Sequence, residues 1–489
     1  MKMHLLVVIY LLGCAAAMYA QPAFSVRTPF ASIGANRRFP KMTTAPDGRI
    51  IMTYVQESGK RGLIYVSMSS DAGVTWTEPS LVTDVLLGVI SLQRQPYAVM
   101  DEFGVLHLVF EDQRIKSQVD VFYSRSTNNG VTWTNGVSVS DDPEGRSLQD
   151  FSSIAVAPGG TVLISFLDKR SELDPNRHIF IVRSTDRGST WSLPTQVDQF
   201  DKAAQGGVCE CCIQNIAATG DGRVAVAFRS NVKNQRDIYI APSTDGGVTF
   251  IKPMRIASDT WTIDACPASG PTMVFDSSNT VHLSWMDERD LIGVSTIWYG
   301  RWSWMSRALP LNTRIMSDKS LMPNWPDVAT TPDGMNVGVV WQTMGGVYFA
   351  RSTSAGIEFD TMQIDTRPAE QMFPHIVCSG GKQFIVSWQA KRNALRDVYL
   401  ATEDVTSVDN AELQDDDADL RGGSSVLYPN PSRTRIHANC TNGYVIFSAT
   451  GQIVRVDSHP ATYIDVTDLP PGVYVLQSGQ NLSRFVVAN

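Results

Sequence analysis

The segment SSDAGVTW, residues 69–76, recurs along the chain as STNNGVTW from Ser126, STDRGSTW from Ser184 and STDGGVTF from Ser243. A weaker copy, STSAGIEF, begins at Ser352. The first four copies start 57, 58 and 59 residues apart, a period that suits one four-stranded unit of a β-propeller and exceeds most helical repeats. The repeat therefore predicts an all-β fold.

Each octet is expected to form a turn. An aspartate at its third position, such as Asp71 or Asp245, can accept hydrogen bonds from nearby backbone N–H groups, and its glycine tolerates a positive φ. The same carboxylate recurs in several units, so these residues cannot all face one active site, and we interpret them as structural. The octet resembles the Asp-box, or BNR repeat, of sialidases and other secreted propellers.

Alternating apolar strands and Asp/Gly turns precede the octets and continue beyond the last one. They define units that begin near Arg38, Arg94, Phe151, Cys212, Cys266, Asn324 and Phe373. Seven units predict a seven-bladed β-propeller, with the six-bladed ring of sialidases as the alternative. A closed ring gathers its inner loops at the axis, where function is expected.

The N-terminal segment differs from the repeats. Lys2 precedes an apolar run and small residues, which is the layout of a secretory signal peptide over residues 1–20. Cleavage of a lipoprotein at Cys14 is the alternative. The propeller is then expected over residues 21–407.

The C-terminal segment also differs. An acidic and Gly/Ser-rich linker is expected over residues 408–425, and short alternating strands over residues 426–489 predict a small β-sandwich. The opening VLYPNPS and the stretch IDVTDLPPGVYVLQ resemble the C-terminal sorting domain of the type IX secretion system. The resemblance implies export across the outer membrane of a Gram-negative bacterium, with that machinery as a partner. An immunoglobulin-like sugar-binding module is the alternative.

The composition excludes one class of partner. A net charge of −8 and a pI near 5.4, without a basic stripe, argue against nucleic-acid binding. After the signal segment, no apolar stretch is long enough to span a membrane. We expect a monomer without a cofactor or a metal, secreted or held at the outer cell surface.

The predicted axial mouth is polar. Loops after the second strand of each unit carry carboxylates, amides and an arginine, which suit a polyhydroxylated ligand such as a glycan. Arg94, Asp168 and Trp325 are expected to contribute to this mouth. The resemblance to sialidases is best at Arg38, in RRFP, and at Arg229, and it implies that both guanidinium groups hold the carboxylate of an acidic sugar.

The resemblance also suggests catalytic candidates. Sialidases use a tyrosine activated by a glutamate, together with an aspartate that protonates the leaving group. Alignment on Arg229 places Cys212 where that glutamate is expected, with Glu210 two residues away. The candidate acids and bases of an exo-glycosidase are Glu210 and, from the loop after the second strand of the fifth unit, Asp287 and Glu288. The alternative is a surface adhesin that binds glycans without turnover.

Four cysteines cluster in the sequence. Cys209, Cys211 and Cys212 lie in GGVCECC, and Cys266 follows one unit later in CPASGP. In an exported protein we expect a disulfide between the fourth and fifth units. A vicinal Cys211–Cys212 bond and a tetrahedral zinc site are the alternatives.

Overall fold

The computed structural model describes the greater part of both predicted domains. It describes residues 24–30, 36–58, 61–82, 94–113, 119–140, 148–170, 176–200, 206–290, 293–304, 311–367, 369–392, 395–403, 434–440, 444–448, 453–478 and 481–487. The expected signal segment and linker lie outside these residues. The chain divides into two compact units, Met1–Glu412 and Leu413–Asn489.

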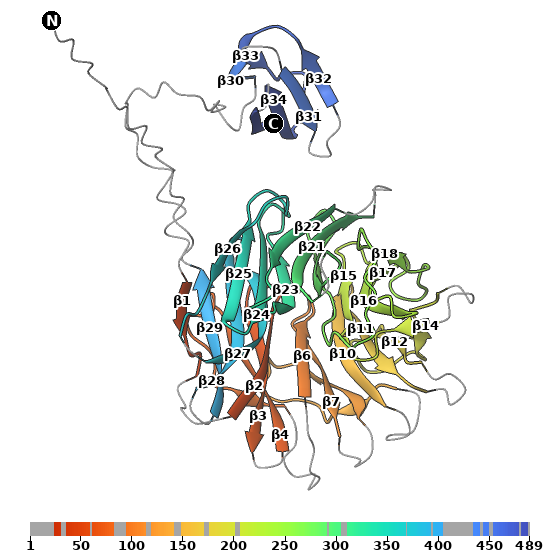
Figure 1. Ribbon diagram of the computed structural model, residues 1–489. Coiled ribbons are helices and arrows are strands. Elements are labelled where there is room, and N and C mark those ends of the chain that lie inside the picture. Colours follow the sequence, from red (N-terminus) through yellow and green to blue (C-terminus); the bar gives the residue numbers. More distant parts are fainter. Residues whose placement is uncertain are drawn as a thin grey trace, which may run out of the picture. The chain divides into compact units, whose positions relative to one another are not determined.

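The described residues of the first unit form antiparallel strands and no helix (Figure 1). The strands are β1 (Phe24–Arg27), β2 (Asn36–Thr44), β3 (Ile50–Ser58), β4 (Arg61–Ser69), β5 (Ser80–Leu81), β6 (Arg94–Met100), β7 (Leu106–Asp112), β8 (Asp120–Ser126), β9 (Val137–Ser138), β10 (Gln149–Ala157), β11 (Thr161–Asp168), β12 (His178–Ser184), β13 (Thr195–Gln196), β14 (Gly206–Val208), β15 (Asn215–Ala218), β16 (Val224–Val232), β17 (Ile238–Ser243), β18 (Met254–Arg255), β19 (Thr272–Phe275), β20 (Thr280–Asp287), β21 (Thr296–Ser303), β22 (Leu311–Ser317), β23 (Asn324–Thr330), β24 (Val337–Thr343), β25 (Gly346–Ser352), β26 (Asp360–Gln363), β27 (Glu370–Ser379), β28 (Gln383–Arg392) and β29 (Leu395–Glu403).

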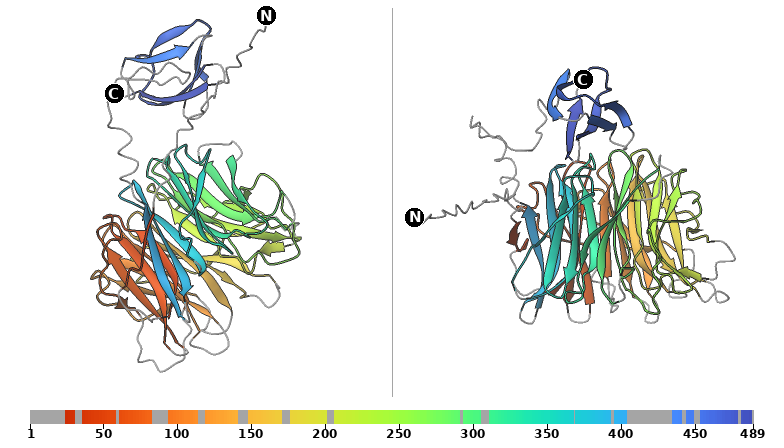
Figure 2. Two further views of the ribbon diagram at one scale, coloured as in Figure 1. Left: turned by 60° about the vertical axis from the view of Figure 1, so that its left-hand side comes forward. Right: turned by 45° about the horizontal axis from the view of Figure 1, so that its top comes forward.

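These strands pair into seven sheets among the described residues. Sheet 1 is β2–β5, sheet 2 is β6–β9, sheet 3 is β10–β13, sheet 4 is β14–β18, sheet 5 is β19–β22, sheet 6 is β23–β26, and sheet 7 is β27–β29 with β1. The first strands contact one another in the order β2, β6, β10, β15, β19, β23 and β27, and β27 contacts β2. The sheets therefore stand side by side around one axis (Figure 2), and the predicted all-β propeller fold is confirmed.

The N-terminal strand closes the ring. Strand β1 pairs with β29, so residues from the two ends of the propeller segment share sheet 7. The ring of Phe24 lies 5.0 Å from that of Phe349, and Arg27 donates two hydrogen bonds, of 3.1 and 2.7 Å, to the carbonyl of Gly73 in the first octet. These contacts join sheet 7 to sheet 6 and to sheet 1.

Apolar cores fill the space between neighbouring sheets. The second strand of each sheet has a neighbouring strand on both sides and another sheet packed against each face. In sheet 2 this strand is β7, and every one of its residues is buried. Each second strand carries one fully buried aromatic side chain at a corresponding position. These are Tyr54, Phe110, Phe166, Phe228, Trp285, Trp341 and Trp388. One large ring per sheet provides much of the apolar surface that holds the sheets together.

The octets form the expected turns at one end of the ring. Asp71 accepts hydrogen bonds from Ser69 Oγ (2.8 Å), Thr75 N (2.8 Å) and Thr75 Oγ1 (2.6 Å), and Gly73 adopts a φ of 79°. In sheet 2, Asn128 takes the place of the aspartate: its Oδ1 accepts from Thr132 N (2.9 Å), and its Nδ2 donates to Thr132 Oγ1 (2.8 Å). These aspartates thus stabilise turns, as the repeat predicted.

The octet carboxylates predict a loss of stability in acid. Hydrogen bonds from Thr75 lower the pKa of Asp71 to about 2, and Thr190 lowers that of Asp186. Because the folded-state pKa lies below the unfolded value of about 3.9, their contribution is complete above pH 4 and is lost as the pH falls toward 2. We expect the triple variant Asp71→Asn, Asp186→Asn and Asp245→Asn to show a smaller drop in Tm between pH 4 and pH 2 than the natural chain. Equal drops in thermal scans would refute this assignment.

Polar side chains cap the inner edge of the ring. The first strands leave N–H groups without a partner in their own sheet, and side chains of the preceding sheet accept from four of them. The donor and acceptor pairs are Ile216 N and Ser153 Oγ (3.4 Å), Met273 N and Asn215 Oδ1 (3.2 Å), Ile376 N and Asp327 Oδ2 (2.9 Å), and Met42 N and His375 Nδ1 (3.4 Å). Burial lowers the pKa of His375 to about 4, so its ring is neutral at pH 7 and Nδ1 can accept.

Lys41 occupies the corresponding position of β2. Its ammonium lies 3.9 Å from the ring centre of Tyr97 in the next sheet. Burial lowers the pKa of Lys41 to about 8, although the carboxylates of Asp327 and Glu111 oppose the shift. The inner edge of the ring is therefore polar and, at Lys41, cationic at neutral pH.

The second unit is a small β domain. Its strands are β30 (Arg435–Cys440), β31 (Tyr444–Ser448), β32 (Ile453–Asp457), β33 (Ala461–Asp465), β34 (Gly472–Ser478) and β35 (Asn481–Val487). Strand β30 pairs with β33, and the other four form a sheet in the order β32, β31, β34, β35. Ile436, Ile446, Ile464 and Leu476 are buried in its core. In neither unit do the described residues include a helix long and apolar enough to cross a membrane.

Candidate functional site

A backbone bulge marks the first strand of several sheets. Non-glycine residues with a φ near +50° stand at these bulges: Phe39, Gln95, Phe151, Trp325 and Phe373. At each of them the register between the first and second strands shifts. Such a bulge bends the strand and re-aims one side chain. We call this end of the ring the mouth; the octets lie at the opposite end, because Ser69 pairs with the first residue of β3.

Three aromatic side chains meet at the mouth from three different sheets. The ring of Phe373 lies 5.3 Å from that of Phe39 and 5.1 Å from that of Trp325. We call these three residues the aromatic cluster. Its side chains are partly exposed, and its bulges are fixed because Phe39 N donates to Gln389 Oε1 (3.0 Å) and Phe373 N to Gln342 Oε1 (2.8 Å). The cluster is thus a preformed apolar surface at the mouth.

Arg38 directly precedes Phe39 and remains accessible. Its side chain is 31% exposed, and its Nε lies 2.9 Å from Glu57 Oε1. Among the described residues, neither Nη atom has a hydrogen-bond partner. Arg38, the residue before Phe39, therefore offers two nitrogen donors, and a guanidinium fork of this kind can bind a planar carboxylate.

Arg229 has a different environment from the one expected. It is fully buried, and its three nitrogens donate to backbone carbonyls: Nε to Ser269 (2.9 Å), Nη1 to Arg236 (2.7 Å) and Nη2 to Met286 (2.6 Å). Burial lowers its pKa to about 10, so the side chain stays charged at neutral pH. The guanidinium joins sheets 4 and 5 and exposes no surface to a ligand. The carboxylate of Asp237 interacts electrostatically with Arg229 but accepts none of these three hydrogen bonds.

The two candidate acids of β20 are engaged by their own loop. Asp287 is buried and forms an ion pair with Arg289, and it also accepts from Trp285 Nε1 at 2.9 Å. Glu288 accepts from Gly293 N and Ser295 Oγ, both at 3.2 Å. Neither carboxylate is free to exchange a proton with a bound sugar in this arrangement.

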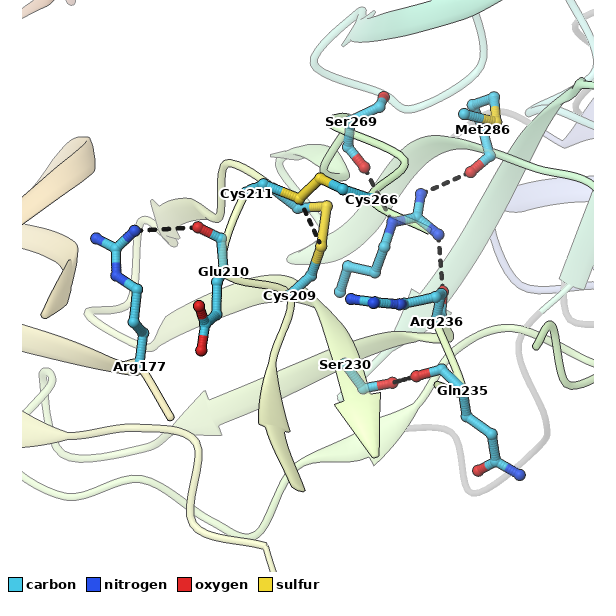
Figure 3. The surroundings of a disulfide bond; sticks show 12 residues. Arg177, Cys209, Glu210, Cys211, Ser230, Gln235, Arg236, Cys266, Ser269 and Met286 are labelled. Atoms are coloured by element: carbon cyan, nitrogen blue, oxygen red, sulfur yellow. Dashed lines mark hydrogen bonds between the residues drawn. A yellow bond between two sulfur atoms is a disulfide. The ribbon is translucent and has the colours of Figure 1, made fainter. Parts of the chain in front are cut away.

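The remaining candidates are dispersed. Asp168 is buried and paired with Arg170, whose Nη2 lies 2.7 Å from Oδ2. Arg94 opens β6 opposite Glu111, and its side chain lies outside the described residues. Glu210 is exposed, and Figure 3 shows Arg177 donating to its backbone carbonyl at 3.0 Å. Of the predicted residues, Trp325 belongs to the aromatic cluster and Arg38 precedes its member Phe39, and both side chains are partly exposed.

The cysteines form two disulfides beside the mouth. Cys211 pairs with Cys266, which joins sheet 4 to the segment before β19, and Cys209 pairs with Cys212 (Figure 3). The Sγ atoms of Cys209, Cys211 and Cys266 lie within 4.8 Å of one another. In sheet 4, the closed turn Cys209–Cys212 takes the place of the simple bulge.

A cavity of about 750 Å³ lies at the octet end of the ring. Turns between first and second strands line it, with Thr44, Asp221, Asp276, Thr330 and Cys378 among the lining residues. Asp221 accepts a hydrogen bond from Arg223, and Asp276 is hydrogen-bonded to His282. None of the predicted binding residues lines this cavity.

Phe39 and Phe373 were not predicted as binding residues. A signal for them is present in the repeats, because an aromatic residue stands before proline in RFPKM, NWPDV and MFPHI. The shared aromatic–proline pair marks equivalent positions in three units, although a proline alone would favour an extended conformation with negative φ for the residue before it.

Comparisons with known proteins give matches of shape only. The sequence matches no protein-family model and no curated protein. Similar solved structures include a protein of unknown function from Dyadobacter fermentans (14% identity, 78% of this chain and 99% of that chain covered, TM-score 0.47). An α-L-arabinanase from Penicillium chrysogenum is also similar (14% identity, 79% of this chain and 98% of that chain covered, TM-score 0.45). So is an intramolecular trans-sialidase from Ruminococcus gnavus (11% identity, 77% of this chain and 96% of that chain covered, TM-score 0.44). These likenesses do not identify a reaction, so we base the proposed function on the residues of the mouth.

Proposed function

We propose that the protein is an exported glycan-binding propeller that holds acidic saccharides at its mouth. The observation that carries the proposal is the aromatic cluster of Phe39, Trp325 and Phe373, which is partly exposed and is held by three sheets. A pyranose ring presents apolar C–H faces between its hydroxyl groups, and a rigid aromatic surface suits such a face.

Arg38 supports an acidic ligand. Arg38 directly precedes Phe39 of the aromatic cluster, and its Nη atoms are without partners among the described residues. A guanidinium fork can donate two parallel hydrogen bonds to a carboxylate. One saccharide could thus place its ring on the aromatic side chains and its carboxylate on Arg38.

Binding fits the mouth better than hydrolysis. A glycosidase of the usual kind needs two carboxyl groups about 5–9 Å apart across the scissile bond. Asp287 and Glu288 are occupied by their own loop, and Glu210 stands exposed on the disulfide turn. The buried Arg229 also removes one of the two arginines expected to hold an acidic sugar. We therefore prefer the adhesin over the exo-glycosidase related to sialidases.

We further propose that the second unit directs export through the type IX secretion machinery after the signal segment has been cleaved. The protein is then secreted or held on the outer cell surface. The support is the DLPPGVYVLQ stretch: Leu469 is buried, and Tyr474 Oη donates to the carbonyl of Pro470 at 2.7 Å, so the motif forms an ordered turn before β34. Fusion of residues 413–489 to a passenger protein in a host with that machinery should place the passenger outside the cell.

The binding proposal is tested with the mature chain on a glycan array and with a panel of labelled glycosides. We expect binding of acidic saccharides without turnover. Arg38→Gln should reduce affinity for an acidic saccharide by about tenfold or more and leave a neutral analogue unaffected, because only the charge-assisted hydrogen bonds are lost. Release of label from a sialoside would replace the adhesin with the hydrolase, and an array without any bound saccharide would exclude both.

A further inference from the structure

We propose that the turn Cys209–Cys212, together with Cys266, is a thiol–disulfide exchange site whose substrate is a dithiol. The exposed Cys211–Cys266 bond receives the electrons, and Cys211 then rearranges the buried Cys209–Cys212 bond. This inference is independent of glycan binding.

The two disulfides differ in accessibility. Cys266 is exposed and Cys211 is half-buried, whereas Cys209 and Cys212 are 1% and 3% exposed. A thiolate from solution can therefore reach the bond between sheets 4 and 5 and cannot reach the bond within the turn. Access of this kind decides which sulfur is attacked.

The bonds are in contact with each other. Cys209 Sγ lies 3.6 Å from Cys211 Sγ, although these two atoms belong to different disulfides (Figure 3). Hydrogen bonds from Cys209 N to the carbonyl of Arg229 (2.9 Å) and from Cys212 N to that of Cys209 (3.2 Å) hold the turn. When Cys211 loses Cys266, its sulfur thus remains beside Cys209.

Charged side chains of both signs lie near the two cysteine segments. Arg229 donates to the carbonyl of Ser269, three residues beyond Cys266, and Arg236 interacts electrostatically with Glu210 and Asp264. Glu210 lies between Cys209 and Cys211, and Asp264 lies two residues before Cys266. The guanidinium groups thus offset the charge of the two carboxylates beside the cysteines, and positive charge near a cysteine favours the thiolate, which is the form that attacks a disulfide.

The dithiol supplies both electrons of the exchange, so no further reactant is needed. A thiolate of the dithiol attacks Cys266 Sγ, forms a mixed disulfide and releases the Cys211 thiolate. The second thiol of the dithiol closes its own ring and releases Cys266 as a thiolate, which takes up a proton. Cys211 then attacks Cys209 Sγ, the Cys209–Cys211 bond forms, the Cys209–Cys212 bond breaks, and Cys212 is protonated. The dithiol is oxidised by two electrons. The protein loses the Cys211–Cys266 and Cys209–Cys212 bonds and gains the Cys209–Cys211 bond.

The test uses the mature chain and limiting dithiothreitol. The reaction is stopped by acid, free thiols are labelled with a maleimide under denaturing conditions, and unreduced peptides are mapped by mass spectrometry. In the species that has lost one disulfide, we expect label on Cys266 and Cys212, and a peptide that contains the Cys209–Cys211 bond. Label on Cys211 and Cys266 with an intact Cys209–Cys212 bond would overturn the proposal. Cys378 and Cys440 form no disulfide and serve as internal references.

A matched pair of variants separates the relay from direct reduction. In Cys266→Ser, Cys211 keeps its thiol beside Cys209, so part of the protein should carry the Cys209–Cys211 bond before any reductant is added. In the double variant Cys211→Ser, Cys266→Ser the relay has no attacking sulfur, because both of the sulfur atoms near Cys209 outside its own bond are gone. The Cys209–Cys212 bond should then open at least about tenfold more slowly than in the natural chain, because an internal thiol acts at a high effective concentration. Equal opening rates, or an unchanged pairing in Cys266→Ser, would contradict the proposal.

Discussion

Replacement of Arg229 by methionine is expected to lower the free energy of unfolding by about 3–5 kcal/mol. Methionine fills a similar volume without the charge, but it leaves the carbonyls of Ser269, Arg236 and Met286 buried without their donor. Each unsatisfied buried acceptor costs about 1–3 kcal/mol. The loss is measured by urea unfolding of the mature chain.

Arg38→Met is the matched control for Arg229. The Arg38 side chain is 31% exposed and has one ion-pair partner, so its replacement should change stability by less than about 1 kcal/mol. If Arg229→Met were as stable as the natural chain and lost saccharide affinity instead, the guanidinium would be a ligand-binding group, and our description of it would be wrong.

Deletion of residues 21–27 is expected to open the ring and to lower the free energy of unfolding by about 4–6 kcal/mol. The deletion removes the ladder between β1 and β29, the contact of Phe24 with Phe349 and the bonds of Arg27 to Gly73. It also exposes the edge of β29, and an exposed edge strand is a template for pairing with another chain. We therefore expect aggregation on heating as well as a lower urea midpoint.

Deletion of residues 21–23 alone provides the control, because β1 begins at Phe24. This variant should unfold at the same urea concentration as the full mature chain. If deletion of residues 21–27 left the urea midpoint of unfolding unchanged, β1 would not contribute to closing the ring.

The propeller fold could be predicted because its determinants are local and repeated. Each octet carries its own turn chemistry, in which Asp71 or Asn128 bonds to a threonine four residues later, and strands alternate between the octets. The ion pair of Asp287 could also have been predicted. Arg289 follows it by two residues, the same spacing as in the pair of Asp168 and Arg170.

The site depended on contacts that the sequence does not display. Arg229 is buried because carbonyls from segments seven, 40 and 57 residues away converge on it. The aromatic cluster needs bulges in β2, β23 and β27, and it forms because β27 contacts both β2 and β23 around the axis. A resemblance in arginine positions could not distinguish a guanidinium that binds a ligand from one that joins two sheets.

The most direct test of the account is calorimetric titration of the mature chain with an acidic saccharide selected on the array. We predict that Trp325→Ala raises the Kd at least about tenfold, because it removes one wall of the aromatic cluster. Leu193→Ala should leave the Kd unchanged, since Leu193 is an exposed apolar residue just after the octet that begins at Ser184. Equal affinities of Trp325→Ala and the natural chain, with both folded, would contradict the assignment of the mouth as the glycan-binding site.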